Sequence, residues 1–181
     1  MKYSTEWLLD QLAHDAHVKY LFFWGHQPSK DGGVTKSCFS QWWLADFVVA
    51  GLTYRSAEHW MMAEKARLFD DERTLARILA AKSPAEAKKL GREIQGFVPE
   101  VWETHKFEIV KTGNRHKFEQ QRDLAAFLLS THDRVLVEAS PVDTIWGIGL
   151  AADAPDAANP ARWQGPNLLG FALMEVRDQI R

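Results

Sequence analysis

Apolar residues recur through most of the chain at spacings of three and four, the period that places side chains on one face of an α-helix. Turn residues separate these segments, so each is predicted to form its own helix. The pattern predicts about seven helices, over residues 4–13, 57–68, 71–81, 83–90, 99–113, 118–131 and 167–181. The last of them is expected to be amphipathic.

Two of these helices carry capping signals. Ser56 is expected to cap the helix over 57–68 through its side-chain oxygen. In "SPAE", Ser83 is expected to cap the helix that follows, Pro84 to take the first helical position, and Glu86 to reach back to the amide of the cap residue. These signals place the first turn of both helices.

Three short segments with another pattern predict strands. Residues 20–26, "YLFFWGH", are rich in aromatic residues, and residues 47–49 precede a turn at Gly51. Residues 134–140 alternate in polarity, as a strand does. Many helices with few short strands predict a predominantly helical α+β fold with a small sheet, rather than an alternating βαβ chain. At 181 residues, the chain has the length of one compact domain.

Composition narrows the classes of function. The net charge of -2 gives no reason to expect bulk nucleic acid or a membrane surface as a partner. The single cysteine, Cys38, rules out an internal disulfide and suits a reducing, cytoplasmic location. The first residues, "MKYSTEWLLDQLAHD", mix charged with apolar residues, so neither a signal peptide nor a transmembrane helix is expected there.

The chain has eight tryptophans. Large rings carry much apolar area, so most are expected in the core, with one or two left to line a pocket. Glycine-rich phosphate loops, dinucleotide fingerprints and HExxH zinc motifs are absent. His14 and His17 lie three residues apart, but no carboxylate or thiol spacing completes a metal site, and nothing supports a nucleophile pair built on Cys38. Neither a metal nor a cofactor is therefore expected.

Acidic residues near aromatic ones are the remaining candidates for chemistry. Glu58 stands in the first turn of the helix over 57–68, where it either supports the helix or serves a site. Lys65 follows two turns later, about 10 Å along the helix axis. Lys65 either belongs to a solvated face or binds a ligand that carries phosphate and spans the distance between Glu58 and Lys65.

A second acidic residue stands in "SPVDTIWGIG", residues 140–149. Asp143 precedes Trp146 by three residues and either caps a turn or belongs to a pocket. Glu138 shares a strand face with Leu136, so it is either paired inside the protein or lines a cavity.

Carboxylates beside stacked rings suit cleavage of an N-glycosidic bond, among several possible reactions. Cleavage builds positive charge on the anomeric carbon of the sugar. A nearby carboxylate stabilises that charge and can deprotonate the attacking water, while an aromatic ring supports the flat face of the leaving base. O-glycosidases divide similar work between two carboxylates.

Seven segments occur in an order that resembles the NADAR family, also called YbiA-like. They are "YRSAEHWMMAEKARLFDD", "SPAEAKKLGREI", "VWE", "KFEQ", "LVEAS", "DTIWGIGL" and "WQGPNLLGFALMEVR". The resemblance runs from about Tyr20 to Arg181 and implies one YbiA-like domain over residues 1–181. Residues 1–19 form an N-terminal extension with no assigned counterpart.

The resemblance implies an N-glycosidase that hydrolyses the bond between ribose 5-phosphate and an aminopyrimidine, in early intermediates of riboflavin biosynthesis. The alternatives that it leaves open are removal of ADP-ribose from guanine in nucleic acid, and non-catalytic binding of ADP-ribose or a nucleotide. The implied partner is a small phosphoribosyl or ADP-ribosyl substrate. Nucleic acid is a partner only if ADP-ribosylated guanine is the substrate, and no membrane partner is implied.

The resemblance also assigns site residues. Glu58, in Ser-x-Glu-His, and Asp143, in Asp-x-x-Trp-Gly, would be catalytic, one activating water and the other orienting the ribose or assisting the leaving group. The expected substrate-binding residues are Trp102 and Trp146 at the base, Lys65 and Arg92 at the phosphate, and Asn167. Glu138 joins them because of the strand pattern described above, not through the resemblance. Gly147 and Gly149 would let the backbone approach the sugar. Gln41 stands where the family often has asparagine.

Overall fold

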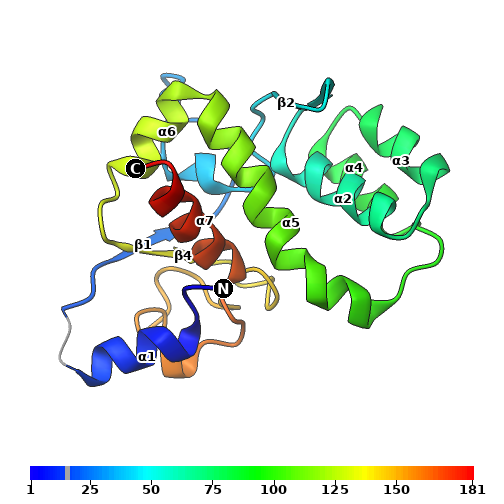
Figure 1. Cartoon of the computed structure of the whole chain (residues 1–181). Helices are drawn as coiled ribbons and strands as arrows, with labels where there is room; N and C mark the ends of the chain where they lie inside the picture. The colour runs from blue at the N-terminus through cyan, green and yellow to red at the C-terminus, as the bar shows by residue number, and fades with distance from the viewer. Residues whose placement is uncertain (15–16) are drawn as a thin grey trace. The chain divides into compact units, whose positions relative to one another are not determined.

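The computed structural model describes residues 1–14 and 17–181, which divide into two units (Figure 1). The terminal unit comprises the described part of Met1–Ser40 together with Asp123–Arg181, and the inserted unit is Gln41–Arg122. Within the described ranges there are seven α-helices and four strands of three or four residues each. The predicted helix-rich α+β fold with short strands is therefore confirmed.

The terminal unit is built on two parallel strands, β1 (Tyr20–Phe23) and β4 (Val135–Glu138). Parallel strands need a long crossover connection, and here the connection contains the whole inserted unit. The helical parts of this unit are α1 (Thr5–Ala13), α6 (Arg122–Leu129), α7 (Leu168–Gln179) and two 3-10 helices, η1 (Lys36–Phe39) and η2 (Pro160–Arg162). Helix α7 packs on β4, and α1 packs on η2.

Helix α7 is buried on every side, which contradicts the amphipathic helix that the sequence predicts. Every residue from Leu169 to Arg177 is buried, including Glu175 and Arg177. The Arg177 guanidinium donates to the Thr131 hydroxyl at 2.8 Å and to the Arg134 carbonyl at 2.9 Å. Because these two hydrogen bonds offset part of the cost of burying the charged group, its polarity did not mark a solvent-facing side.

In the inserted unit, helix α2 (Ala57–Leu68) packs against three others, α3 (Glu72–Leu79), α4 (Pro84–Gly91) and α5 (Pro99–Gln120) (Figure 1). Strands β2 (Phe47–Val49) and β3 (Leu52–Tyr54) form an antiparallel hairpin. Its two turn residues, Ala50 and Gly51, have φ of 50° and 80°, as a two-residue hairpin turn of type I′ requires. The sequence predicted the turn but not β3.

The capping predictions are confirmed, with one correction. The Ser56 hydroxyl accepts from the His59 amide at 3.3 Å, and the Ser83 hydroxyl accepts from the Glu86 amide at 3.2 Å. Glu86 reaches back one residue further than expected, since its carboxylate accepts from the Lys82 amide at 2.7 Å.

Helix α5 runs seven residues beyond its predicted end at Gly113. A Cβ atom on Gly113 would lie 2.2 Å from Cδ1 of Trp60, so the glycine makes room for the indole ring. That ring is also held by a hydrogen bond from Nε1 to the Ile109 carbonyl at 2.8 Å. A glycine that marks a helix end in the sequence is therefore a packing residue within the helix.

The tryptophans do not form the core as expected. Only Trp60 of the eight, all of which lie in the described ranges, is buried, and Trp24 is 57% exposed. The other six are half-buried, with part of each ring at the surface. The buried apolar residues are mainly phenylalanines and aliphatic side chains instead.

Candidate functional site

The eight residues expected at the site divide equally between the two units. Helices α2, α4 and α5 of the inserted unit carry Glu58, Lys65, Arg92 and Trp102. The terminal unit carries the other four, Glu138, Asp143, Trp146 and Asn167, at the end of β4, in the loop that follows and before α7. Each of the two groups of four residues is therefore arranged within its own unit.

Glu58 is a buried carboxylate in the first turn of α2, with 3% of its surface exposed. Its amide donates to the Gln41 carbonyl at 2.9 Å, which fixes the start of the helix. A helix N-terminus favours a negative charge. An acidic residue that only supports a helix can do so from the surface, whereas burial of a carboxylate costs free energy. Its burial therefore favours a role beyond helix support.

The residues around Glu58 are held by buried hydrogen bonds. His59 Nδ1 lies 2.7 Å from the Ser56 hydroxyl, and Nε2 lies 3.2 Å from the Ala81 carbonyl. Burial lowers the pKa of His59, so the imidazole beside Glu58 is neutral at neutral pH. Gln41 accepts a hydrogen bond from the Asn114 amide at 2.7 Å. The residue that departs from the family pattern is thus built into the interior of this unit.

Lys65 is not on a solvated face. Its Nζ donates to the Gly91 carbonyl at 2.9 Å and lies 4.2 Å from the ring centroid of Phe97 and 5.5 Å from that of Trp102. Burial lowers the pKa of this ammonium group. The structure therefore brings Lys65 and Trp102 together, in an arrangement in which a cation meets two aromatic rings.

Arg92 adds a second positive charge to this end of the inserted unit. It is the exposed C-cap residue of α4 and directly follows Gly91, which accepts the Lys65 hydrogen bond. A helix C-terminus is a favourable position for cations. Lys65 and Arg92 thus offer two cations at one helix end.

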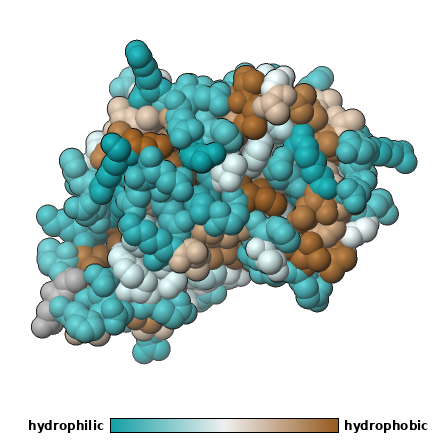
Figure 2. Space-filling model, in the orientation of Figure 1, coloured by the Kyte–Doolittle hydropathy of each residue, from teal (hydrophilic) through white to brown (hydrophobic). Residues whose placement is uncertain are grey.

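Phe97 is a residue of this cluster that the sequence did not single out. It is 41% exposed, and its ring meets that of Phe69 edge-on at a centroid distance of 5.2 Å. With Val98 and Val101 it forms an exposed apolar surface at the start of α5, the brown area at the lower right of Figure 2. The apolar pair Phe97 and Val98, shortly before the "VWE" segment of the family resemblance, was the signal that the sequence offered.

In the terminal unit, Asp143 and Trp146 belong to one tight turn. One carboxylate oxygen of Asp143 accepts from the amides of Ile145 at 2.9 Å and Trp146 at 2.7 Å. The Trp146 carbonyl then accepts from the Leu169 amide at 3.1 Å, which ties the turn to the start of α7. The capping interpretation of Asp143 therefore describes its geometry, and the half-buried carboxyl and indole lie within three residues of each other.

Asn167 connects this turn to β4. It is fully buried in a left-handed conformation, with φ of 55°. Its side-chain oxygen accepts from the Glu138 amide and its nitrogen donates to the Leu136 carbonyl, both at 2.9 Å. Both ends of the amide thus bind the backbone of β4, so Asn167 holds the strand residue Glu138 in position.

The glycines of this segment make room for protein rather than for a ligand. A Cβ atom on Gly147 would lie 2.7 Å from the Glu138 carbonyl oxygen, and one on Gly149 would lie 2.8 Å from Cβ of Gln164. The expectation that they let backbone approach the sugar is therefore corrected: the space beside each is already filled by this chain.

Two features are absent from the described residues. No group of three or more histidine, cysteine or acidic side chains there is placed to hold a metal ion. None of the helices in those ranges is long and apolar enough to cross a membrane.

Comparison with known proteins gives concordant matches. The family model described as the NADAR domain matches residues 22–181. N-glycosidase R617 of Acanthamoeba polyphaga mimivirus is 42% identical over 166 residues, which cover 89% of this chain and 96% of that protein. N-glycosidase YbiA of Escherichia coli K12 is 34% identical over 132 residues, covering 73% of this chain and 74% of that protein.

A solved structure matches as well. The NMR structure of the Escherichia coli protein YbiA superposes with a TM-score of 0.69 at 30% sequence identity. The match covers 89% of this chain and 84% of the YbiA chain.

Proposed function

Because the chain belongs to the NADAR family, we propose that it hydrolyses the N-glycosidic bond between ribose 5-phosphate and an aminopyrimidine. Several of its relatives are named N-glycosidases, and the chain is accordingly a hydrolase that acts on N-glycosyl compounds. The proposed substrates are the reactive early intermediates of riboflavin biosynthesis, small molecules that contain a sugar, a phosphate and a flat base.

The arrangement of Lys65 carries this proposal. Its ammonium lies on the rings of Phe97 and Trp102 and donates to the carbonyl of Gly91, the residue that precedes the exposed Arg92. A phosphorylated nucleoside offers an anion and a flat ring, and this cluster offers cations and aromatic surface. The pKa of Lys65 is lowered because burial removes part of the solvent around its ammonium group. A bound phosphate dianion would stabilise the positive charge in place of that solvent.

The proposed reaction uses the buried Glu58, two turns earlier on the same helix face and about 10 Å along the axis. Its carboxylate stabilises the positive charge that develops on the anomeric carbon and takes a proton from the attacking water. The water oxygen bonds to that carbon as the carbon–nitrogen bond breaks. The bond electrons leave with the base, which takes up a proton, and the products are ribose 5-phosphate and the free aminopyrimidine.

The proposal also keeps the roles that the sequence analysis gives to Asp143 and Trp146 of the terminal unit. Asp143 would orient the ribose or assist the departing base through the carboxylate oxygen that does not cap its turn, and Trp146 would support the base. Glu138, fixed in position by Asn167, would contribute a further polar contact to the substrate.

Release of ribose 5-phosphate from the phosphoribosylaminopyrimidine is the assay. Glu58→Gln should lower turnover by about 10²–10⁴-fold, the usual contribution of general acid–base catalysis. Glu64→Gln is the matched control, because it makes the same change on the same helix at a residue that pairs with Arg67. Turnover in Glu58→Gln equal to that of the control would remove Glu58 from the mechanism.

The same preparation tests the two alternatives. Loss of the modification from an ADP-ribosylated oligonucleotide, seen as a band shift on a gel, would assign the chain to guanine-linked ADP-ribose instead. Saturable binding of ADP-ribose by calorimetry, with no product from either substrate after long incubation, would make it a binding module.

A further inference from the structure

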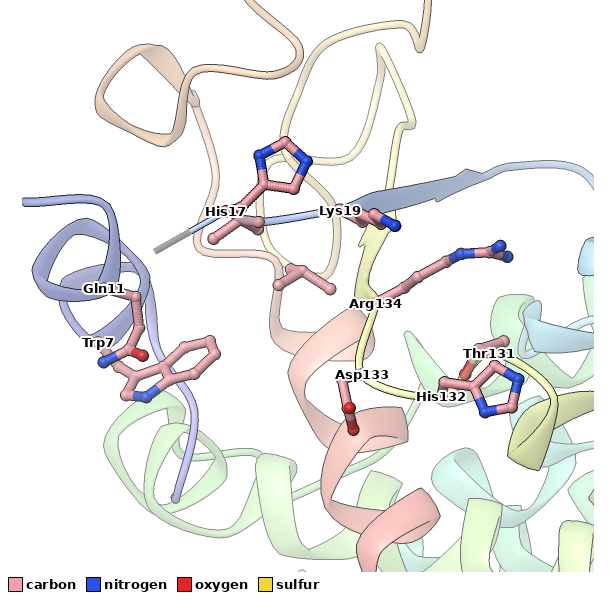
Figure 3. Close-up of a pocket in the computed structure, with 10 residues that line it drawn as sticks. Trp7, Gln11, His17, Lys19, Thr131, His132, Asp133 and Arg134 are labelled. Atoms are coloured by element: carbon pink, nitrogen blue, oxygen red, sulfur yellow. The ribbon is translucent and has the colours of Figure 1, made fainter. Parts of the chain in front are cut away.

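The terminal unit contains a cavity of about 470 Å³ that the proposed reaction does not use (Figure 3). This volume lies within the range of about 300–1,000 Å³ that is usual for small-molecule sites. The cavity is lined by Trp7, Gln11, His17, Val18, Lys19, Thr131, His132, Asp133, Arg134 and Val135. None of these residues belongs to the set that the family resemblance assigns.

The cavity lies at the amino-terminal ends of the two parallel strands. Val135, the first residue of β4, pairs with Tyr20, and its amide donates to the Lys19 carbonyl at 2.9 Å. The candidate residues of the same unit begin at Glu138, the last residue of β4, which is about 10 Å further along the strand. The cavity and these candidate residues therefore stand at opposite ends of the strand pair.

One wall comes from residues that precede the segment matched by the family model. Trp7 and Gln11 extend from α1 toward the cavity in Figure 3, and the family match begins at residue 22. The chain before α1 is anchored on α7, where the Tyr3 hydroxyl donates to Asp178 at 2.7 Å. The Tyr3 ring meets the Trp7 ring edge-on at 4.7 Å, so the indole is held in a fixed orientation.

The charges that line the cavity are mainly positive. The exposed side chains of Lys19 and Arg134 extend in the same direction in Figure 3, and neither forms an ion pair with any described residue. Asp133, the acidic residue of the lining, pairs instead with Arg181 at 2.9 Å. The two histidines of the lining add ring N–H groups as further donors.

We propose that this cavity binds a nucleoside monophosphate, with the base against Trp7 and the phosphate held by Lys19 and Arg134. An indole ring accepts any nucleobase on its face. A guanidinium group binds phosphate through two parallel hydrogen bonds, and a lysine adds a charge beside it. An aromatic surface and two cations around one cavity of this size match the two chemical parts of such a ligand.

Calorimetric titration of the full chain with AMP tests the proposal. The charge-reversed variant Lys19→Glu/Arg134→Glu should bind AMP at least about tenfold more weakly, because two charge-assisted contacts are lost. Both side chains are exposed, so the fold should tolerate the change. Lys30→Glu/Arg162→Glu is the matched control: it makes the same two substitutions at exposed positions of the same unit, outside the cavity lining, and should bind AMP as the wild type does.

Two partial ligands separate the contributions of base and phosphate. Adenosine should bind more weakly than AMP and be insensitive to the charge reversal, whereas inorganic phosphate should lose its weak binding in Lys19→Glu/Arg134→Glu. Raising the ionic strength should weaken the binding of AMP more than the binding of adenosine, since the two cationic side chains are exposed. The Trp7→Leu substitution should weaken the binding of adenosine and the binding of AMP to a similar extent.

Three results would overturn the proposal. The first is the absence of saturable AMP binding to the wild type at millimolar nucleotide. The second is equal weakening in the two charge-reversed variants, which would indicate a general electrostatic effect. The third is AMP binding that survives Lys19→Glu/Arg134→Glu and disappears in Lys65→Met, which would place the nucleotide at the proposed catalytic group. All three are independent of whether the chain hydrolyses the aminopyrimidine substrate.

Discussion

Replacing Asn167 by alanine should destabilise the protein by about 4–6 kcal/mol, because one buried amide makes two hydrogen bonds to β4. Each bond contributes about 1 kcal/mol net, and leaving the Glu138 amide and the Leu136 carbonyl buried without partners adds about 1–3 kcal/mol. Alanine also tolerates the left-handed conformation less well than asparagine, by roughly 1 kcal/mol. For a chain of this length the melting temperature should fall by roughly 10–20 °C.

Urea unfolding followed by tryptophan fluorescence measures this loss directly. The matched control is Asn159→Ala, which removes an exposed cap that accepts one hydrogen bond from the Ala161 amide at 3.2 Å and should cost about 0.5–1 kcal/mol. If Asn167→Ala unfolds at the same urea concentration as this control, but has a raised KM for the aminopyrimidine substrate, then Asn167 contacts substrate rather than holding the strand, and the structural reasoning is refuted.

Two further predictions concern the inserted unit. Gly113→Ala should destabilise the protein by about 1–3 kcal/mol in the same urea assay, although alanine is the better helix former, because its Cβ would lie 2.2 Å from Cδ1 of the buried Trp60; an unchanged or raised stability would show that the indole can shift freely. The free energy of unfolding should also fall as the pH drops below about 6.5, because burial lowers the pKa of His59 and the unfolded chain therefore binds more protons in this range. The fall should be smaller in His59→Gln, and an equal fall in both proteins would assign the acid sensitivity to other groups.

The sequence determined the elements whose signals are local. Ser56 and Ser83 mark the starts of α2 and α4, since a capping side chain acts within its own first turn. Helical periodicity located all seven helices, and the ordered motifs identified the family. Assignment of residues 1–181 to one domain, and of the chain to the cytoplasm, stays a prediction from the sequence.

For the candidate site, the sequence supplied residue types but not their surroundings. It selected Glu58, Lys65 and Trp102 without indicating that the first is buried or that the other two meet over an aromatic surface. The sequence did not identify Phe97, because its contact with Lys65 joins the last turn of α2 to the residues just before α5. Helical periodicity relates only residues within one helix, so it cannot reveal such a contact.

The tertiary structure alone decided what polar and small residues do inside the protein. Local patterns treat a charged residue such as Arg177 as facing solvent and a glycine such as Gly113 as a helix end. In the structure the buried Arg177 donates two hydrogen bonds, to the Thr131 hydroxyl and the Arg134 carbonyl, and Gly113 stays within a helix because Trp60 occupies the adjacent space. Such roles depend on atoms supplied by distant parts of the chain, and packing of those atoms is fixed only when the whole unit has folded.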